Sequence, residues 1–172
     1  MSDYRRLYIP GGRYFFTLVA YRRQPIFTDE QRVMLLRQAF REVKNKRPFD
    51  LLAEVVLPNH LHCLWRLPKG DADFSTRWQM VKTAFSRRIP ANVKKDGSKA
   101  IWQPRFYEHC LRDESDFHKH LDYIHNNPVK HGLLVLPGEW SYSSFKCFVN
   151  LGWSAQDWGG YSRYGRYGAG IV

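Results

Sequence analysis

The sequence predicts an α+β fold: a ferredoxin-like antiparallel sheet in the order β-α-β-β-α-β, followed by a further helix. Three observations support this prediction. Short segments of alternating apolar residues are separated by longer segments in which apolar residues recur every three or four positions. Two strand-like segments are joined only by Pro58-Asn59, which fits an antiparallel hairpin. A length of 172 residues suits one domain with a substantial core.

The first half of the chain is expected to supply a strand, a helix and the hairpin. Residues 13–21 alternate between two partly apolar faces, as in a central strand. Thr28, with a glutamine three residues later, predicts the start of a helix, and one apolar stripe carries this helix to Lys46. Residues 49–57 and 60–67 are the two strands of the hairpin.

The second half is expected to add a helix and the fourth strand. Residues 74–89 have the apolar spacing of a helix and a basic outer surface. A basic loop containing glycine follows at 91–99. Residues 101–111 are the fourth strand, interrupted by Pro104.

A third helix is expected to begin after Asp113 or Ser115 and to end by Asn127, because a proline follows and disfavours helical geometry in the residue before it. The sequence offers no convincing interdomain linker, so residues 1–150 are assigned to one domain. Residues 151–172 are rich in Gly, Tyr and Arg and are expected to form a tail.

Composition indicates a polyanionic partner. Lys and Arg number 27 against 16 acidic residues, which gives a net charge of +11 and a pI near 9.8. Aromatic residues reach 16%, and together with basic side chains they suit stacking on unpaired bases. No apolar run approaches the roughly 18 residues of a membrane span, and the first residues do not resemble a secretory signal. The three cysteines lack CxxC spacing, which favours a reduced, cytoplasmic protein.

The most informative motif is a pair of histidines. His60 and His62 flank one leucine in the second hairpin strand, so both imidazoles project from the same face. Imidazole nitrogens suit Zn, Mn and related ions, and an amide oxygen can complete a site that also holds water and a substrate phosphate. The alternative is two histidines with satisfied hydrogen bonds and no metal.

The third helix carries a polar stripe formed by Asp116, His120, Tyr123 and Asn127. Tyr123 is the candidate nucleophile for a phosphodiester whose oxygen is polarised by the ion, and Asn127 is the candidate third protein ligand. A tyrosine at the edge of the core with a satisfied hydroxyl is the alternative. Three further histidines are expected at the surface or behind the ligands: His120, His125 and His131.

Taken together, these motifs resemble the single-tyrosine HUH transposases (histidine, hydrophobic, histidine) and, within them, the REP-associated tyrosine transposases. The resemblance covers most of the chain, and its motifs are far more specific together than the histidine pair alone. They lie at residues 4–6 with Gly11-Gly12, 56–63, 101–109 and 122–132.

The resemblance implies a fold of the HUH nuclease type and a metal-dependent reaction. His60, His62 and Asn127 would bind Mg²⁺ or Mn²⁺, and Tyr123 would attack the scissile phosphate. The products would be a 5′-phosphotyrosine and a free 3′-hydroxyl that can later rejoin strands. Many insertion-sequence relatives carry Gln where this chain has Asn127, a difference that bears on the ligand geometry.

The resemblance also implies the partner. It would be single-stranded or hairpin DNA, a REP-type palindrome flanked by a tetranucleotide, bound by a monomer away from any membrane. The C-terminal tail would influence access of the DNA.

Candidates for DNA contacts are basic side chains, with aromatic rings as stacking platforms. The basic candidates are Arg5, Arg6, Arg22, Arg23, Arg77, Lys82, Arg87, Arg88 and Arg105. The aromatic candidates are Tyr8, Trp78 and Trp102. For each residue alone, a solvated charge or a core ring is the alternative.

Three other functions are weighed against this interpretation. A non-enzymatic hairpin-binding domain on the same frame fits the charge and aromatics equally well, and only activity that depends on Tyr123 separates the two. A histidine-triad hydrolase would need a third alternating histidine where the chain has Leu64. A replication initiator or relaxase is disfavoured by the short chain and the lone tyrosine in residues 122–127.

Overall fold

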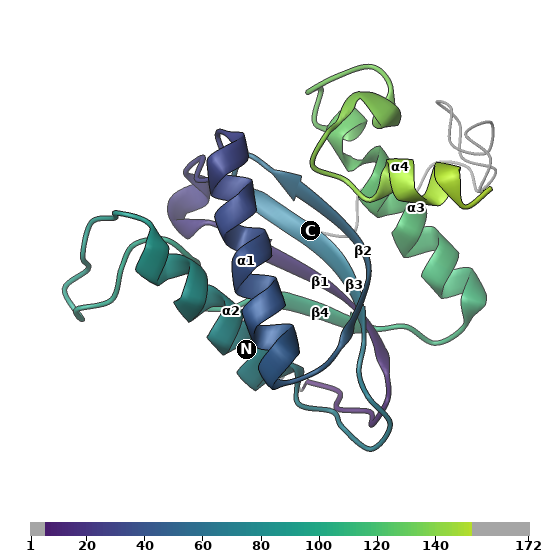
Figure 1. Cartoon of the computed structure of the whole chain (residues 1–172), viewed down its shortest axis with the longest axis horizontal. Helices are drawn as coiled ribbons and strands as arrows, with labels where there is room; N and C mark the ends of the chain where they lie inside the picture. Colours follow the sequence, from purple (N-terminus) through teal and green to yellow (C-terminus); the bar gives the residue numbers. More distant parts are fainter. Residues whose placement is uncertain (1–5, 153–172) are drawn as a thin grey trace, which may run out of the picture.

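A computed structural model describes residues 6–152, and its centre is one four-stranded antiparallel sheet (Figure 1). The strand order is β2-β3-β1-β4, as a ferredoxin-like arrangement requires. The strands are β1 (Arg13–Val19), β2 (Asp50–Leu57), β3 (His60–Arg66) and β4 (Tyr107–Cys110). The predicted fold class and the tight hairpin between β2 and β3 are confirmed.

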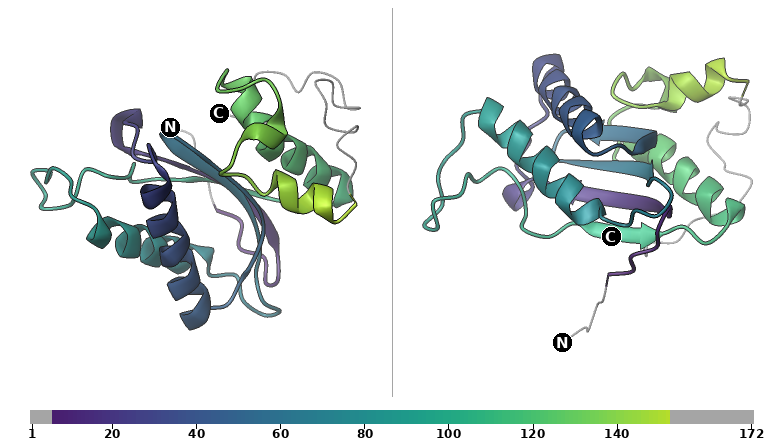
Figure 2. Two further views of the ribbon diagram at one scale, coloured as in Figure 1. Left: turned by 45° about the horizontal axis from the view of Figure 1, so that its top comes forward. Right: turned by 60° about the horizontal axis from the view of Figure 1, so that its bottom comes forward.

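Helices cover both faces of this sheet. Figure 2 shows α1 (Glu30–Lys46) and α2 (Phe74–Arg88) side by side on one face, with α3 (Glu114–Lys130) and the short α4 (Phe145–Asn150) on the other. Two short 3-10 turns complete the described elements: η1 (Tyr21–Arg23) and η2 (Pro137–Glu139). The ferredoxin-like order accounts for the first two helices on one face, and α3 covers the second.

Alternation along the strands separates the two layers. On β1, Tyr14 and Phe16 point into the core beneath α1 and α2, whereas Phe15 points toward α3. Trp78 of α2 lies flat on Trp65 of β3, with ring centroids 4.1 Å apart. The larger core therefore lies away from α3, and the α3 face keeps room for polar side chains.

Each long helix begins at an aspartate whose carboxylate accepts a hydrogen bond from the backbone N–H three residues later. These caps are Asp29, Asp73 and Asp113. The first helix thus begins at Glu30, capped by Asp29 rather than by the predicted Thr28. Aspartate carries a charge that also suits the positive end of the helix dipole.

The fourth strand is shorter than predicted. Only Tyr107–Cys110 pairs with β1, and the preceding residues form turns, apart from a single bridge between Ala20 and Trp102. Pro104 lies between this bridge and β4, and it has no N–H to offer the ladder.

The third helix is longer than predicted and passes through Pro128 to Lys130. The added turn ends in two backbone bonds, from Gly132 N–H to Val129 O (2.9 Å) and from Leu133 N–H to Pro128 O (3.0 Å). Gly132 has φ +67°, so this is a Schellman ending, which needs the left-handed geometry that glycine adopts without strain. The predicted end at Asn127 was wrong because this ending compensates for the bond lost at the proline.

Within residues 6–152, no helix combines the length and apolar character needed to cross a bilayer. The last described helix ends at Asn150, next to the predicted domain boundary. Arg5 and residues 153–172, which include most of the predicted tail, lie outside the described residues.

Candidate active site

The two histidines of β3 lie on the sheet face that α3 covers. His60 is 5% exposed and His62 3% exposed, and their ring centroids are 5.0 Å apart. In the sheet register His62 is opposite Thr17, and His60 is opposite Val19. The predicted convergence of both imidazoles on one face is confirmed.

His62 offers one ring nitrogen that no described residue satisfies. Its Nδ1 lies 2.8 Å from Thr17 Oγ1, while its buried Nε2 has no hydrogen-bond partner within residues 6–152. A neutral ring that donates from Nδ1 to the threonine keeps a lone pair on Nε2. In that tautomer the threonine holds one ring nitrogen while the other can bind a metal ion.

His60 is held in the same way by its neighbour. Its Nδ1 lies 2.6 Å from Asn59 Oδ1. An amide oxygen only accepts hydrogen bonds, so Nδ1 must be the donor and the lone pair lies on Nε2. With its Nδ1 held by Asn59 of the hairpin turn, His60 could bind a cation through Nε2.

Both rings are neutral near pH 7. Burial lowers the pKa of His60 to about 4, and the nearby charges of His131 and Arg23 act in the same direction. The pKa of His62 is well below its usual range, again because of burial. Imidazoles that are already deprotonated can bind a cation without releasing a proton.

Asn127 of α3 is fully buried beside these histidines. Neither its Oδ1 nor its Nδ2 has a hydrogen-bond partner among the described residues. The amide is nevertheless close enough to His60 to raise the pKa of that ring slightly, against the larger effect of burial. An unsatisfied buried amide costs about 1–3 kcal/mol of stability. The chemistry of the three side chains fits a divalent cation, with two imidazole nitrogens and one amide oxygen as donors.

Tyr123 lies one helical turn before Asn127, at the side of the histidine pair. Its ring centroid is 5.1 Å from that of His62 and 5.8 Å from that of Phe15, edge to face in both cases. The ring is half-buried, so the predicted nucleophile borders both the core and the surface. The site thus places a phenol next to three potential metal donors.

Two residues near the site were not predicted to belong to it. Lys130 was not considered, and His131 was expected at the surface or behind the ligands. Lys130 Nζ lies 4.9 Å from the centroid of the Tyr123 ring, and the His131 ring is 5.0 Å from that of His60. They are seven and eight residues beyond Tyr123, spacings that return to the same face of a helix. This signal was lost because the helix was expected to end at Asn127.

The beginning of α3 is attached to β4 through Asp116. Its carboxylate accepts hydrogen bonds from His109 Nε2 (2.8 Å) and from Arg112 N–H (3.1 Å), and it lies 3.3 Å from His120 Nδ1. Burial would raise the pKa of Asp116, but these hydrogen bonds outweigh it and bring the pKa to about 2. The polar stripe predicted on this helix therefore serves two purposes, with its first half fixing α3 to the sheet.

Three of the predicted DNA contacts are contradicted by burial. Arg77 is 1% exposed, and its guanidinium donates to Asp71 and to three backbone carbonyls, so it has no donor available to DNA. Trp78 is fully buried in the core, stacked on Trp65. Trp102 is 6% exposed and packs against Phe27 and Phe85, so it cannot act as a stacking platform.

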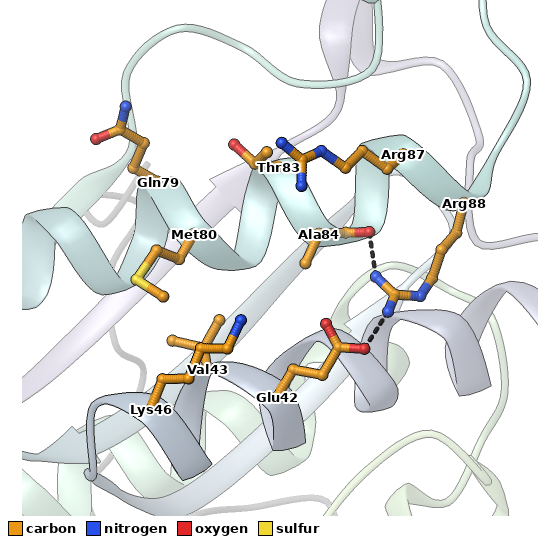
Figure 3. A pocket seen from close by; sticks show the side chains of 9 residues that line it. All are labelled: Glu42, Val43, Lys46, Gln79, Met80, Thr83, Ala84, Arg87 and Arg88. Carbon is orange, nitrogen blue, oxygen red and sulfur yellow. Dashed lines mark hydrogen bonds and ion pairs between the residues drawn. The ribbon is translucent and has the colours of Figure 1, made fainter.

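The remaining candidates differ in how free their charges are. Lys82 is half-buried and donates to Gln103 O (2.8 Å), and burial lowers its pKa to about 8. Figure 3 shows Arg88 bonded to Glu42 and to Ala84 O, whereas Arg87 carries no such bond to the residues drawn.

At the opposite end of α2, Arg6 donates a hydrogen bond to Ser75 and lies over the Phe106 ring, and Tyr8 stacks on Phe74.

The structure neither supports nor contradicts four of the predicted DNA contacts: Arg22, Arg23, Arg87 and Arg105. Arg22 and Arg23 are exposed, and both have φ +52°, which is unusual for non-glycine residues and often marks functional segments.

The sheet with a histidine pair on β3 and a tyrosine on α3 defines an α+β fold of the HUH type. Residues 10–127 match the family described as Transposase IS200 like. A REP-associated tyrosine transposase of Escherichia coli K12 is 45% identical over 93% of this chain and 92% of that protein. A putative one from Haemophilus influenzae is 39% identical over 93% of this chain and 94% of that protein.

Solved structures agree with these relatives. A REP-associated tyrosine transposase bound to a REP hairpin is 43% identical, with a TM-score of 0.82 over 100% of this chain and 99% of that chain. A putative transposase from Deinococcus radiodurans, 19% identical with a TM-score of 0.50 over 72% of this chain and 96% of that chain, shares the fold alone. The chain therefore belongs to the IS200-like transposase family and, within it, to the REP-associated tyrosine transposases.

Proposed function

We propose that this protein is a metal-dependent endonuclease and strand transferase that cuts single-stranded DNA at REP-type palindromic hairpins and acts as a monomer. The observation that carries this proposal is the position of Tyr123. It lies beside the ring nitrogens of His60 and His62 that can bind a metal ion, and beside the amide of Asn127. A phenol next to an unsatisfied set of metal donors is what attack on a phosphodiester requires.

The reaction can be written from these groups. The Tyr123 oxygen forms a bond to phosphorus while the bond from phosphorus to the 3′ oxygen breaks, leaving a 5′-phosphotyrosine. The phenol loses its proton, and the departing 3′ oxygen gains one to become a hydroxyl. Mg²⁺ or Mn²⁺ held by the two histidines and Asn127 would supply Lewis-acid polarisation of the phosphate. The reverse reaction would join a 3′-hydroxyl to the DNA held on Tyr123.

Two kinds of support favour hairpin DNA as the substrate. The net charge of +11 favours a polyanion, and exposed Arg22 and Arg23 lie just beyond β1, close enough to the site for Arg23 to act on His60. The 43% identical relative was solved with a REP hairpin bound. We propose that the hairpin stem or its flanking strand follows this basic segment to the site.

The deciding experiment is an adduct assay on labelled single-stranded hairpins with Mg²⁺ or Mn²⁺. The substrates are palindromic repeats taken from the DNA around the gene. We expect a covalent protein–DNA adduct that requires metal and is lost in Tyr123→Phe. Tyr107→Phe is the matched control, because Tyr107 is another tyrosine on the same sheet face, opposite Thr17, and should keep the adduct.

Other outcomes distinguish the alternatives. Binding of the hairpin by the native protein without adduct formation under either ion would favour a binding module. An adduct that survives Tyr123→Phe and disappears in Tyr107→Phe would identify a different nucleophile.

A further inference from the structure

The last turn of α3 places a lysine against the candidate nucleophile. Lys130 Nζ lies 4.9 Å from the centroid of the Tyr123 ring, a cation–π geometry. This position exists only because α3 continues past Pro128 and is closed by the glycine at 132. A helix that ended at Asn127 would not direct Lys130 to this face.

The charge of Lys130 is not neutralised within residues 6–152. The side chain is exposed, and no described carboxylate lies within ion-pair distance of its ammonium group. Because its ammonium group lies over the Tyr123 ring, Lys130 faces the site as well as the solvent. Within the described residues this cation makes no ion pair; it suits the negative end of the α3 dipole and also lies against the Tyr123 ring.

The attack of a tyrosine on a phosphodiester concentrates negative charge. The phenolic oxygen becomes anionic as it loses its proton, and it approaches a phosphate that already carries one negative charge. A fixed positive group beside the ring lowers the free energy of that arrangement more than it lowers that of the neutral phenol. A metal ion held by His60 and His62 would polarise the phosphate, whereas Lys130 lies against the Tyr123 ring.

We propose that Lys130 is the electrostatic partner of Tyr123 and favours the negative charge that the phenolic oxygen carries during attack. The proposal rests on the proposed function, because it assigns a role within the same reaction. Lys130 acts through Tyr123: it places a positive charge beside the tyrosine and does not itself contact the reacting phosphate. Its contribution should be visible in the rate of cleavage rather than in hairpin affinity.

The test measures adduct formation in a single turnover at saturating hairpin, together with the hairpin Kd. Lys130→Met removes the charge and keeps the length of the side chain. We expect its rate to fall about ten-fold, with Kd changed less than about three-fold, since a preorganised charge at a reacting group is worth at least a factor of about ten. Lys130→Arg keeps the charge and should recover the rate to within about three-fold.

Lys44→Met is the matched control, because Lys44 is an exposed lysine of α1, which covers the opposite face of the sheet (Figure 2). It removes the same net charge and should leave the rate unchanged. Thermal unfolding of all variants checks that they fold.

Three results would overturn the proposal. The Lys130→Met rate could equal that of the native protein, or Kd could weaken as much as the rate falls, which would make Lys130 a DNA contact. Alternatively, Lys130→Arg could fail to recover the rate, which would show a packing role. Absence of any adduct with the native protein would instead overturn the proposed function itself.

Discussion

At the scale of single residues, the candidate site combines a buried imidazole nitrogen and a buried amide that have no hydrogen-bond partners among the described residues. His62 Nε2 and both amide atoms of Asn127 have none among the described residues, whereas Asp116 and Arg77 elsewhere in the molecule are fully engaged. Buried polar groups are normally hydrogen-bonded, and exceptions call for a functional reason. The proposed metal ion would be such a reason, since it would bind these atoms.

This gives a prediction for Asn127→Leu. Leucine has nearly the shape of asparagine but no polar atoms, so the desolvation cost of the amide disappears. We expect the free energy of unfolding, measured by urea denaturation with a chelator present, to rise by about 1 kcal/mol. Adduct formation in Mg²⁺ should be lost in the same variant, because one metal donor is gone.

Asn126→Leu is the control for this prediction. The Asn126 amide donates to Asp122 O at 3.0 Å, so its replacement removes a formed hydrogen bond and should not stabilise the protein. If Asn127→Leu instead lowers the free energy of unfolding by more than Asn126→Leu does, the amide of Asn127 has a hydrogen-bond partner in the metal-free protein, and the prediction is wrong.

Residue spacing predicted which side chains converge at the candidate site, but three of the candidate DNA contacts proved to be buried. The histidine pair was recognisable because the two-residue period of a strand fixes which side chains converge. Trp78 was misjudged although it belongs to the apolar stripe of its helix, whereas the burial of Arg77 was hidden because its partners lie outside the helix pattern. Asp71 and three carbonyls surround Arg77, and those partners come from a turn and a loop that no spacing rule predicts.

At the scale of elements, the strand order and helix positions followed from periodicity, while two boundaries did not. Proline was given too little weight in the strand, which was expected to begin before Pro104, and too much in the helix, which was expected to end before Pro128. Pro104 did interrupt pairing, because a sheet has no substitute for the missing donor. Pro128 did not end α3, because a glycine four residues later supplies a Schellman ending for the added turn.

The added turn can be tested with Gly132→Ala. Gly132 has φ +67°, and a residue with a Cβ is strained there by about 1 kcal/mol. We expect a loss of about 1 kcal/mol of stability in urea denaturation. The rate of adduct formation should also fall, because the end of α3 carries Lys130 and His131.

Gly70→Ala separates these two effects. Gly70 has φ +82° and, like Gly132, open space where a methyl group would lie, but it belongs to the turn after β3, at the opposite end of that strand from His60. The stability cost should be similar and the rate unchanged. Equal rates in the two variants would show that the last turn of α3 has no part in the reaction.

At the scale of the whole molecule, histidines link folding to pH. His125 of α3 is fully buried between α3 and α4, with Nε2 2.9 Å from Ser144 Oγ and its ring 5.1 Å from that of Phe148. Burial lowers its pKa to about 3, and it lowers that of His60 to about 4. The folded protein therefore holds these rings neutral at pH values where the unfolded chain would protonate them.

The sign of the resulting pH dependence follows from proton counting. Between about pH 6.5, the ordinary pKa of histidine, and about pH 3, the unfolded chain binds a proton at residue 125 that the folded protein does not. The contribution of neutral His125 to the free energy of unfolding is therefore fully present above about pH 6.5 and decreases as the pH falls. One such proton contributes a slope of about 1.4 kcal/mol per pH unit.

We expect His125→Gln to reduce this slope by about 1.4 kcal/mol per pH unit between about pH 6 and pH 4, in urea denaturation with a chelator present. Glutamine can still bond to Ser144 and cannot gain a charge. The native protein and the variant are compared first at a slightly alkaline pH, where the histidine is neutral in both states, so that the effect of replacing the ring itself is subtracted. Parallel curves would mean that residue 125 is protonated in the folded protein too. A flatter curve for the variant would show that protonation of His125, at the contact between α3 and α4, contributes to the loss of stability in acid.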